Sequence, residues 1–405
     1  MSFIPFVSGN TTKQNNRTLV LKEIRNHKSI TKMDLINTFD LTPTAIGNII
    51  DELIKADIIH KVGYGKSKGG RPPVLYAIKW DKVYVIAIAI GVQNISASLV
   101  NLKGEIRGEI IFDNSNSPLI ERVYALIGIL FEKAGEEGRK ILGIGISAPG
   151  PVDSSSGVIL TPPNLEGANN LDITKLLEDR YKLSTILEVD ANASALAEQW
   201  FGAVDLNKDI LYIYNDQGLG GSLIINTRMY KGFGNGAGEI GHMTVDLDGP
   251  QCSCGNYGCL EILSSGIAIK KEVKAQIRRG FPTSLQNLYK DGVDKLELNN
   301  IVEYARNGDQ LAKQTLDKAA RYLGIGLSNA INLFSPDKVI FGGDVITLYP
   351  ESIEIAEEVA KERSFSPLAK KIEFEKSKFN EHSNLIGAAA TIQQKLFDNP
   401  EGIII

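Results

Sequence analysis

The first eighty residues contain short amphipathic segments separated by turn residues, in the order typical of a small helical domain. Residues 14–27 place Leu19, Ile24 and neighbouring apolar residues at helical spacing, which predicts a first helix. Asn15 and Asn16 stand near its start and are the candidate caps of this helix.

Two further helices are predicted directly after the first. Residues 32–39 (KMDLINTF) form one of them, and a helix that begins at Pro43 behind the cap residue Thr42 forms the other. An apolar stripe runs along this third helix: Ile46, Ile49, Ile50, Leu53 and Ile54. Thr42, Thr44 and Asn48 near its N-terminal half are polar, which is typical of a helix that enters the DNA major groove by that end.

Residues 61–78 (KVGYGKSKGGRPPVLYAI) have the pattern of a β-hairpin, with a tip rich in glycine and lysine and a second strand from Val74 to Ile78. Lys66, Lys68 and Arg71 at the tip could contact phosphates or a minor groove. Helices and hairpin together predict a winged helix-turn-helix that binds double-stranded DNA. Winged helices also serve as protein-interaction modules, which is the alternative interpretation.

The rest of the chain alternates strand and helix patterns. An apolar run of about ten residues from Val83 to Val92 is too short for the ~20 residues that cross a bilayer, so it predicts a buried strand that opens an antiparallel meander. The next predicted elements are a helix at 118–138, a strand at 141–150, a helix at 172–181 and a strand that ends at 189–190. A second strand-glycine-strand unit at 209–232 predicts two duplicated α/β lobes with a cleft between them.

Composition and charge are consistent with a soluble protein of two or three domains. The chain has 405 residues, of which 43% are hydrophobic and 23% charged. No basic leader precedes an apolar segment, so we expect a cytoplasmic protein with no membrane partner. The net charge of -4 conceals a basic head, because residues 1–80 carry 12 Lys and Arg against 6 Asp and Glu. This asymmetry favours a polyanion-binding module, although chance clustering on a solvated face is an alternative.

The three cysteines lie close together, and their chemistry points to a metal. Cys252, Cys254 and Cys259 are odd in number and too local for a disulfide framework. With His242 they supply three thiolates and one imidazole, the set that closes a tetrahedral zinc site. A full shell leaves no position for water, so this zinc is expected to be structural. Small buried thiols without a metal are the alternative.

Several segments carry a resemblance to a known family. The segment 238–261 (GEIGHMTVDLDGPQCSCGNYGCLE) closely resembles the signature of the ROK family, which comprises repressors, open reading frames and kinases. Residues 147–152, 189–198 and 323–346 resemble three further family segments, and the GRPP sequence at 70–73 resembles the repressor branch. The resemblance extends from about residue 10 to the C-terminus.

The resemblance implies an α/β fold of the actin and hexokinase superfamily, which is ribonuclease H-like and has two lobes. It places the DNA-binding domain at residues 1–78 and the first lobe at 79–199, completed by a C-terminal helix at 385–398. The second lobe, with the zinc site, spans 200–384.

The resemblance also implies a sugar site. Its expected contacts are Asn164, Asp190, Glu239, His242 and Glu261. Carboxylates suit sugar hydroxyls because each accepts two or more hydrogen bonds, and the metal would hold the two glutamates in place. Taken singly, each residue could be a surface or capping residue. The segment 242–261 favours a monosaccharide such as xylose or glucose over N-acetylglucosamine derivatives.

The loops that would hold ATP depart from the pattern of the family's kinases. Asp190 stands at the position of the kinase base, but the first phosphate loop, Asp-x-Gly-Gly-Thr in the family, is Ala89-Ile90-Gly91-Val92-Gln93 here. The second loop has Asp216 where the family has glycine, and a carboxylate there repels ATP. Only the Gly342-Gly343 turn is intact. We therefore expect no enzyme and no catalytic residue.

These observations predict a sugar-responsive repressor of carbohydrate-utilisation genes. The protein would bind a two-fold-related operator as a homodimer or a tetramer. Sugar would release DNA by binding the DNA-incompetent state more tightly. The alternatives are an active ROK sugar kinase with an accessory DNA-binding domain, and a metabolite-free structural or partner-binding protein.

Overall fold

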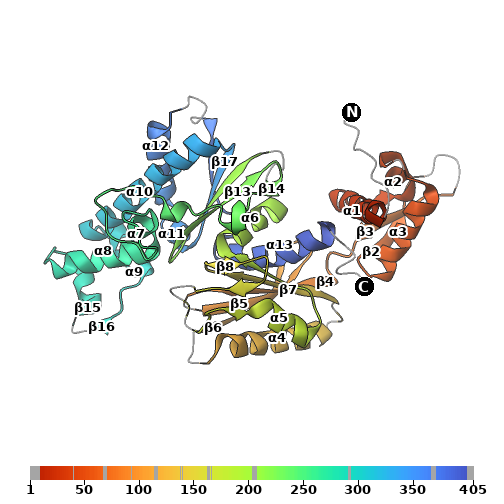
Figure 1. Cartoon of the computed structure of the whole chain (residues 1–405), viewed down its shortest axis with the longest axis horizontal. Helices are drawn as coiled ribbons and strands as arrows, with labels where there is room; N and C mark the ends of the chain where they lie inside the picture. The colour runs from red at the N-terminus through yellow and green to blue at the C-terminus, as the bar shows by residue number, and fades with distance from the viewer. Residues whose placement is uncertain are drawn as a thin grey trace.

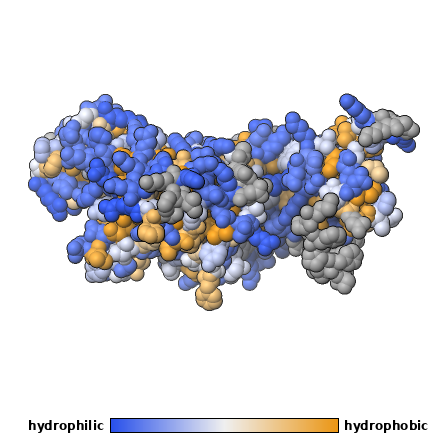
Figure 2. All heavy atoms as spheres, turned by 90° about the horizontal axis from the view of Figure 1, so that it is seen from above, coloured by the Kyte–Doolittle hydropathy of each residue, from blue (hydrophilic) through white to orange (hydrophobic). Residues whose placement is uncertain are grey.

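The computed structural model shows three bodies in a row: a small helical head, a central sheet with its helices, and a second sheet with its helices (Figure 1). It describes residues 10–39, 41–66, 71–92, 94–113, 117–136, 138, 140–161, 165, 167–202, 208–290, 293–365 and 371–398. Hydrophilic residues cover most of the surface visible in Figure 2, and apolar atoms gather in small separate patches. Among the described residues, no helix combines the length and apolar character needed to span a membrane.

The head is a helix-turn-helix followed by a hairpin. Its elements are α1 (Asn10–Asn26), β1 (Ile30–Thr31), α2 (Lys32–Thr38), α3 (Pro43–Lys55), β2 (Ile59–Tyr64) and β3 (Val74–Ile78). The three strands form one sheet in the order β1-β3-β2. As predicted, Thr42 caps α3, because its Oγ1 accepts the Ala45 N–H at 3.2 Å. The caps predicted for α1 are wrong, since this helix begins at Asn10 and Asn15 and Asn16 lie within it.

The central sheet has the strand order β11-β7-β4-β5-β6. Its strands are β4 (Val83–Ile90), β5 (Asn94–Asn101), β6 (Ile106–Asp113), β7 (Lys140–Ala148) and β11 (Thr185–Val189). All of β4 is buried, and its residues alternate between two cores: Val85 packs with α13 (Ser383–Asp398), while Ile86 packs with α4 (Leu119–Glu136) and α5 (Ile173–Tyr181). A small separate sheet is formed by β8 (Val152–Asp153), β9 (Val158–Ile159) and β10 (Leu171–Asp172).

The second large sheet repeats this topology, in the order β14-β13-β12-β17-β18. Its strands are β12 (Ile210–Asn215), β13 (Leu219–Ile225), β14 (Arg228–Met229), β17 (Lys338–Gly342) and β18 (Glu373–Lys376). In both sheets three antiparallel strands are followed by two parallel ones, so the predicted duplication of α/β lobes is confirmed.

The helices of the second body lie mostly after its first three strands. They are α7 (Glu261–Ser264), α8 (Gly266–Arg278), α9 (Leu298–Arg306), α10 (Gln310–Phe334), α11 (Asp344–Leu348) and α12 (Glu351–Arg363). The described residues also form short elements: η1 (Phe233–Asn235), η2 (Ile240–His242), η3 (Ser284–Leu288), β15 (Tyr289–Lys290), β16 (Val293–Asp294) and η5 (Asn380–His382).

Helix α6 (Asp190–Phe201) lies between the two large sheets and packs closely against α13 (Figure 1). The approach requires glycine: a Cβ on Gly387 would lie 1.8 Å from the Ala193 carbonyl oxygen, and one on Gly145 would lie 1.9 Å from that of Ala388. β7, α13 and α6 therefore form one tightly packed stack. The domain boundaries that we placed at residues 78/79 and 199/200 stay a prediction.

Candidate metal centre and carboxylate site

One imidazole and three thiols of the segment 242–259 form a cluster. Ligand atoms of His242, Cys252, Cys254 and Cys259 all lie within 4.8 Å of one another. Cys252 Sγ is 3.7 Å from His242 Nδ1, and Cys254 Sγ is 3.7 Å from Cys259 Sγ. The predicted ligand set is thus brought together in space.

The backbone of the segment 238–261 holds this cluster by tight turns. Cys252 N–H donates to the Asn256 carbonyl at 2.7 Å, and Gly255 N–H donates back to the Cys252 carbonyl at 2.9 Å. Gly258 has a φ of +62°, and a Cβ there would lie 1.6 Å from the Asp246 carbonyl oxygen. Only glycine fits at this position, so the turn is built to bring Cys259 to the other ligands.

The dimensions of the cluster fit a zinc ion. Two thiolates bound to zinc at about 2.3 Å in tetrahedral geometry lie roughly 3.8 Å apart, close to the observed sulfur–sulfur separation. Burial and the neighbouring Cys254 thiol together raise the pKa of the Cys259 thiol to about 12. A bound dication reverses this tendency, because it stabilises the thiolate forms.

The described carboxylates of the predicted sugar site also lie together. Asp190 is the first residue of α6, Glu239 precedes η2, and Glu261 is the first residue of α7. Both glutamates are close enough to Asp190 to act on its charge. Glu261 Oε2 accepts the Leu219 N–H at 3.1 Å, which fixes its orientation. The predicted Asn164 lies outside the described residues.

His242 belongs to the histidine–cysteine cluster and also faces this carboxylate site. Its Nδ1 faces Cys252, while its Nε2 lies 3.9 Å from Glu239 Oε2. A metal-bound imidazole that faces a carboxylate with its other nitrogen is held in one tautomer and one orientation. The His242 ring thus lies between Cys252 and Glu239.

Asp190 has an unusual protonation equilibrium. Burial and the nearby Asp216, Glu239 and Glu261 together raise its pKa to about 7, although the Ala191 N–H that donates to its Oδ1 at 2.7 Å lowers it. A half-buried carboxyl that titrates near neutrality can accept hydrogen bonds from a polyol when ionised. It can also take a proton from one.

A second carboxyl pair adjoins the site, and its burial was not predicted. Burial and the neighbouring Asp344 raise the pKa of Asp216 to about 7. Tyr214 Oη donates to Asp216 Oδ2 at 3.3 Å, and this bond and the backbone N–H groups of Gln217 and Asp344 oppose the rise of its pKa. Asp344 follows the Gly342-Gly343 turn. The sequence shows that an aspartate, Asp216, stands where the resemblance places a glycine. Its proximity to Asp344 could not be predicted, because it depends on the pairing of β12 with β17.

The candidate DNA-contacting residues are exposed on the head. Thr44 and Asn48 lie on the exposed face of α3, and Lys66 and Arg71 lie next to the ends of β2 and β3. Lys68 lies outside the described residues. Thr42 is exposed but already engaged as the cap of α3.

Comparison with known proteins identifies the family. The model of the ROK family matches residues 85–395. The chain belongs to the ROK family. This ROK protein is 33% identical to a xylose repressor from Caldicellulosiruptor bescii, across 97% of this chain and 99% of the relative. The expected family is confirmed.

Two solved ROK structures show how far the likeness extends. A ROK family transcriptional regulator, described as a homologue of the E. coli MLC protein, matches with a TM-score of 0.81 and 28% identity over 97% of this chain and 98% of its own. A ROK family glucokinase from Streptomyces griseus, solved with glucose and AMPPNP, matches with a TM-score of 0.67 and 27% identity over 77% of this chain and 99% of its own. The regulator therefore matches head and body, and the expected fold class is confirmed.

Proposed function

We propose that this chain is a sugar-responsive transcriptional repressor of carbohydrate-utilisation genes. The match to a xylose repressor along nearly the whole of both chains carries this proposal, because it includes the helix-turn-helix head as well as the carboxylate site. The head, residues 1–78, binds operator DNA. The lobes, 79–199 with 385–398 and 200–384, bind the sugar between them, and the sugar-bound form releases the operator.

The effector is a monosaccharide, with xylose first and glucose second. The xylose repressor relative supports xylose, and the glucokinase solved with glucose supports glucose. Asp190, Glu239, Glu261 and His242 receive the sugar hydroxyls, and Asn164 is the fifth expected contact. Three carboxylates at one site offer many acceptor positions, as a ring of hydroxyl donors requires.

His242, Cys252, Cys254 and Cys259 would hold a structural zinc ion. Zinc would supply a cross-link between the two ends of the segment 242–259, and all four of its positions would be filled by protein. The role of this chain's residues is to keep His242 and Glu239 oriented toward the sugar.

The phosphotransfer machinery is degenerate in this proposal, so the protein is not an enzyme. The half-buried Asp216, next to Asp344, brings negative charge to the loop that holds phosphates in the family's kinases. One observation favours the alternative of an active sugar kinase: Asp190 titrates near pH 7, which suits a general base. The expectation of a cytoplasmic protein remains a prediction.

A panel of monosaccharides separates the two functions. Thermal shift and calorimetry of the purified, zinc-loaded chain should detect binding of xylose or glucose, while a coupled assay should detect no sugar-dependent ATP consumption. Sustained ATP turnover with any sugar of the panel would establish the kinase instead. Absence of binding by every sugar would contradict the effector proposal.

The DNA-bound form is proposed to be a homodimer or a tetramer. One head offers one recognition helix, and a single module of this size seldom provides the affinity of a specific complex. Paired heads would read a two-fold-related operator. Analytical ultracentrifugation at micromolar concentration checks this point directly.

A further inference from the structure

The last turns of α1 dock against the C-terminal ends of α6 and α13. The Arg25 guanidinium lies over the Trp200 ring, 3.7 Å from its centroid, and its Nη2 donates to the Trp200 carbonyl at 3.4 Å. The same guanidinium lies 5.2 Å from the Phe397 ring, which in turn packs 5.4 Å from Trp200. Three residues far apart in the sequence thus form one cation–aromatic contact between head and body.

A second charged contact lies one turn earlier on the same face of α1. Lys22 Nζ is 2.6 Å from Asp398 Oδ1, and Thr18 Oγ1 donates to the Asp398 carbonyl at 3.1 Å. Lys22 and Arg25 therefore place positive charge at the ends of two helices whose C-terminal dipoles favour cations. Burial lowers the pKa of Arg25 to about 10, so the guanidinium stays charged at neutral pH. These contacts, of Arg25 with Trp200 and Phe397 and of Lys22 with Asp398, form the dock between head and body.

The other end of α6 is the carboxylate site. Asp190 is its first residue, and Trp200 lies ten residues later, roughly 15 Å along the helix axis. Between them, Glu198 Oε1 accepts hydrogen bonds from Ser377 Oγ at 2.6 Å and Lys378 N–H at 2.8 Å, both from the segment after β18. Because Asp190 and Trp200 belong to one helix, a displacement of α6 as a unit moves both residues.

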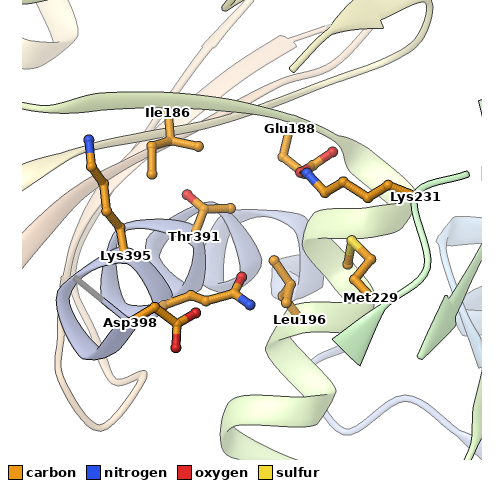
Figure 3. A pocket seen from close by; sticks show the side chains of 9 residues that line it. Ile186, Glu188, Leu196, Met229, Lys231, Thr391, Lys395 and Asp398 are labelled. Carbon is orange, nitrogen blue, oxygen red and sulfur yellow. The ribbon is translucent and has the colours of Figure 1, made fainter. Parts of the chain in front are cut away.

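A cavity beside α6 and α13 leaves room for such a movement. It has a volume of about 240 Å³ and is lined by residues of β11, α6, β14 and α13 (Figure 3). On one side Lys231, just after β14, reaches Glu188 at 2.5 Å, while Lys395 and Asp398 of α13 line the other side. The cavity leaves unfilled space beside Lys395 and Asp398, whereas Leu396 and Phe397 of the same turn are buried in the core.

We propose that the dock of Arg25 on Trp200 and Phe397, supported by Lys22 on Asp398, couples sugar binding at Asp190 to the position of the DNA-binding head. The inference rests on the proposed function, since it names the residues through which the sugar acts on DNA. Sugar closure on the carboxylates shifts α6 along the stack, and Arg25 carries that shift into α1. Arg25 is a positioning residue and touches neither sugar nor operator.

Arg25→Ala and Trp200→Leu test the coupling, with Lys28→Ala as the matched control. Lys28 is exposed in the turn after α1 and loses the same charge. The quantity measured is the operator Kd with saturating xylose divided by the Kd without it, for the full chain loaded with zinc. We expect a wild-type ratio of about 10–100, a value near 1 for both dock variants and an unchanged ratio for Lys28→Ala. The xylose Kd in the absence of DNA should stay within about twofold.

A spectroscopic measurement checks the dock without DNA. Trp80→Phe leaves Trp200 as the only tryptophan, so its fluorescence reports the Arg25 contact. Xylose should change the acrylamide quenching of this tryptophan, and Arg25→Ala in the same background should remove the change. Circular dichroism shows whether each variant folds.

The outcomes separate the inference from the proposed function. A wild type that responds to xylose, together with dock variants that keep its full ratio and its quenching change, overturns the coupling and leaves the repressor intact. A wild type that responds to neither xylose nor glucose overturns the proposed function, and the coupling with it.

Discussion

Asp190 and Glu261 differ in their surroundings, and this difference predicts how each should respond to substitution. Glu261 is oriented by the Leu219 N–H, whereas Asp190 is bonded to its own helix start through the Ala191 N–H. Both carboxylates keep free acceptor positions for a ligand. Their amide analogues preserve shape and remove only the charge.

Asp190→Asn and Glu261→Gln should each weaken sugar binding at least tenfold, since a hydrogen bond to a charged acceptor contributes about 1.5–3 kcal/mol. Operator affinity without sugar should stay within about twofold. Calorimetry with xylose and a DNA titration measure the two quantities, with the exposed Glu354→Gln as control. Loss of sugar-free operator binding would mean that the residue joins the lobes instead of contacting the ligand.

Asp216 should make the protein less stable as the pH rises. Its pKa of about 7 in the folded state exceeds the value near 3.8 of a free aspartate, so the folded state binds the proton more tightly. The free energy of unfolding therefore falls between about pH 4 and pH 7. Asp216→Asn should stabilise the chain by roughly 1–3 kcal/mol at pH 8 and by less at pH 5. Denaturant unfolding at both pH values, with exposed Asp179→Asn beside it, tests this; an equal effect at both would refute it.

Cys254→Ser should remove stoichiometric zinc and lower the stability of the second body, because a structural metal site contributes directly to folding. Ser253→Ala, between two ligands, is the matched control and should keep the metal. Elemental analysis and thermal unfolding follow both effects. A wild type purified with no stoichiometric zinc, even when refolded with the ion, would eliminate the metal site.

At the scale of elements, α3 and the hairpin after it should bind DNA in different ways. The exposed Thr44 and Asn48 belong to a helix whose apolar face is buried in the head, so their side chains are free to meet base edges. Lys66 and Arg71 extend from strand ends and suit phosphate contacts. Thr42 is a poor probe, since its loss also removes a helix cap.

Thr44→Ala or Asn48→Ala should therefore cost about 1–3 kcal/mol on the operator and little on random DNA. Lys66→Ala or Arg71→Ala should weaken both complexes and reduce the salt slope by about one unit for each lost phosphate contact. Salt titrations of operator and scrambled duplexes give both numbers. If the Lys66 and Arg71 variants keep the DNA affinity and the salt slope of the wild type, the basic charge of the hairpin lies on a solvated face and does not contact DNA.

Elements with a local signal were predictable from the sequence. The Thr42-Pro43 start of α3 was read correctly because cap and proline act within one turn. The eight buried residues of β4 were marked by their apolar run. The start of α1 was predicted wrongly, because asparagine is common both as a cap and inside polar helices. The helix begins at Asn10.

At the scale of the whole molecule, the duplicated lobes could be inferred from two strand-glycine-strand units, and the cluster of one histidine and three cysteines from four residues within one segment. The dock of Arg25 on Trp200 and Phe397 could not be inferred, because no local pattern relates residues from the start, the middle and the end of the chain. The pairing of Asp216 with Asp344 likewise depends on how β12 and β17 meet. Contacts between residues far apart in the sequence could therefore not be predicted from local patterns.

The central claim is that one chain binds operator DNA and releases it when it binds a sugar. The most direct test is the operator affinity of the zinc-loaded full chain, with the operator selected from random duplexes, measured by fluorescence anisotropy with and without xylose or glucose at fixed salt. We predict that one of these sugars raises the operator Kd about 10–100-fold while affinity for scrambled DNA changes little. Sequence-specific binding that is unaffected by both sugars, or no preference for any selected sequence, would contradict the account.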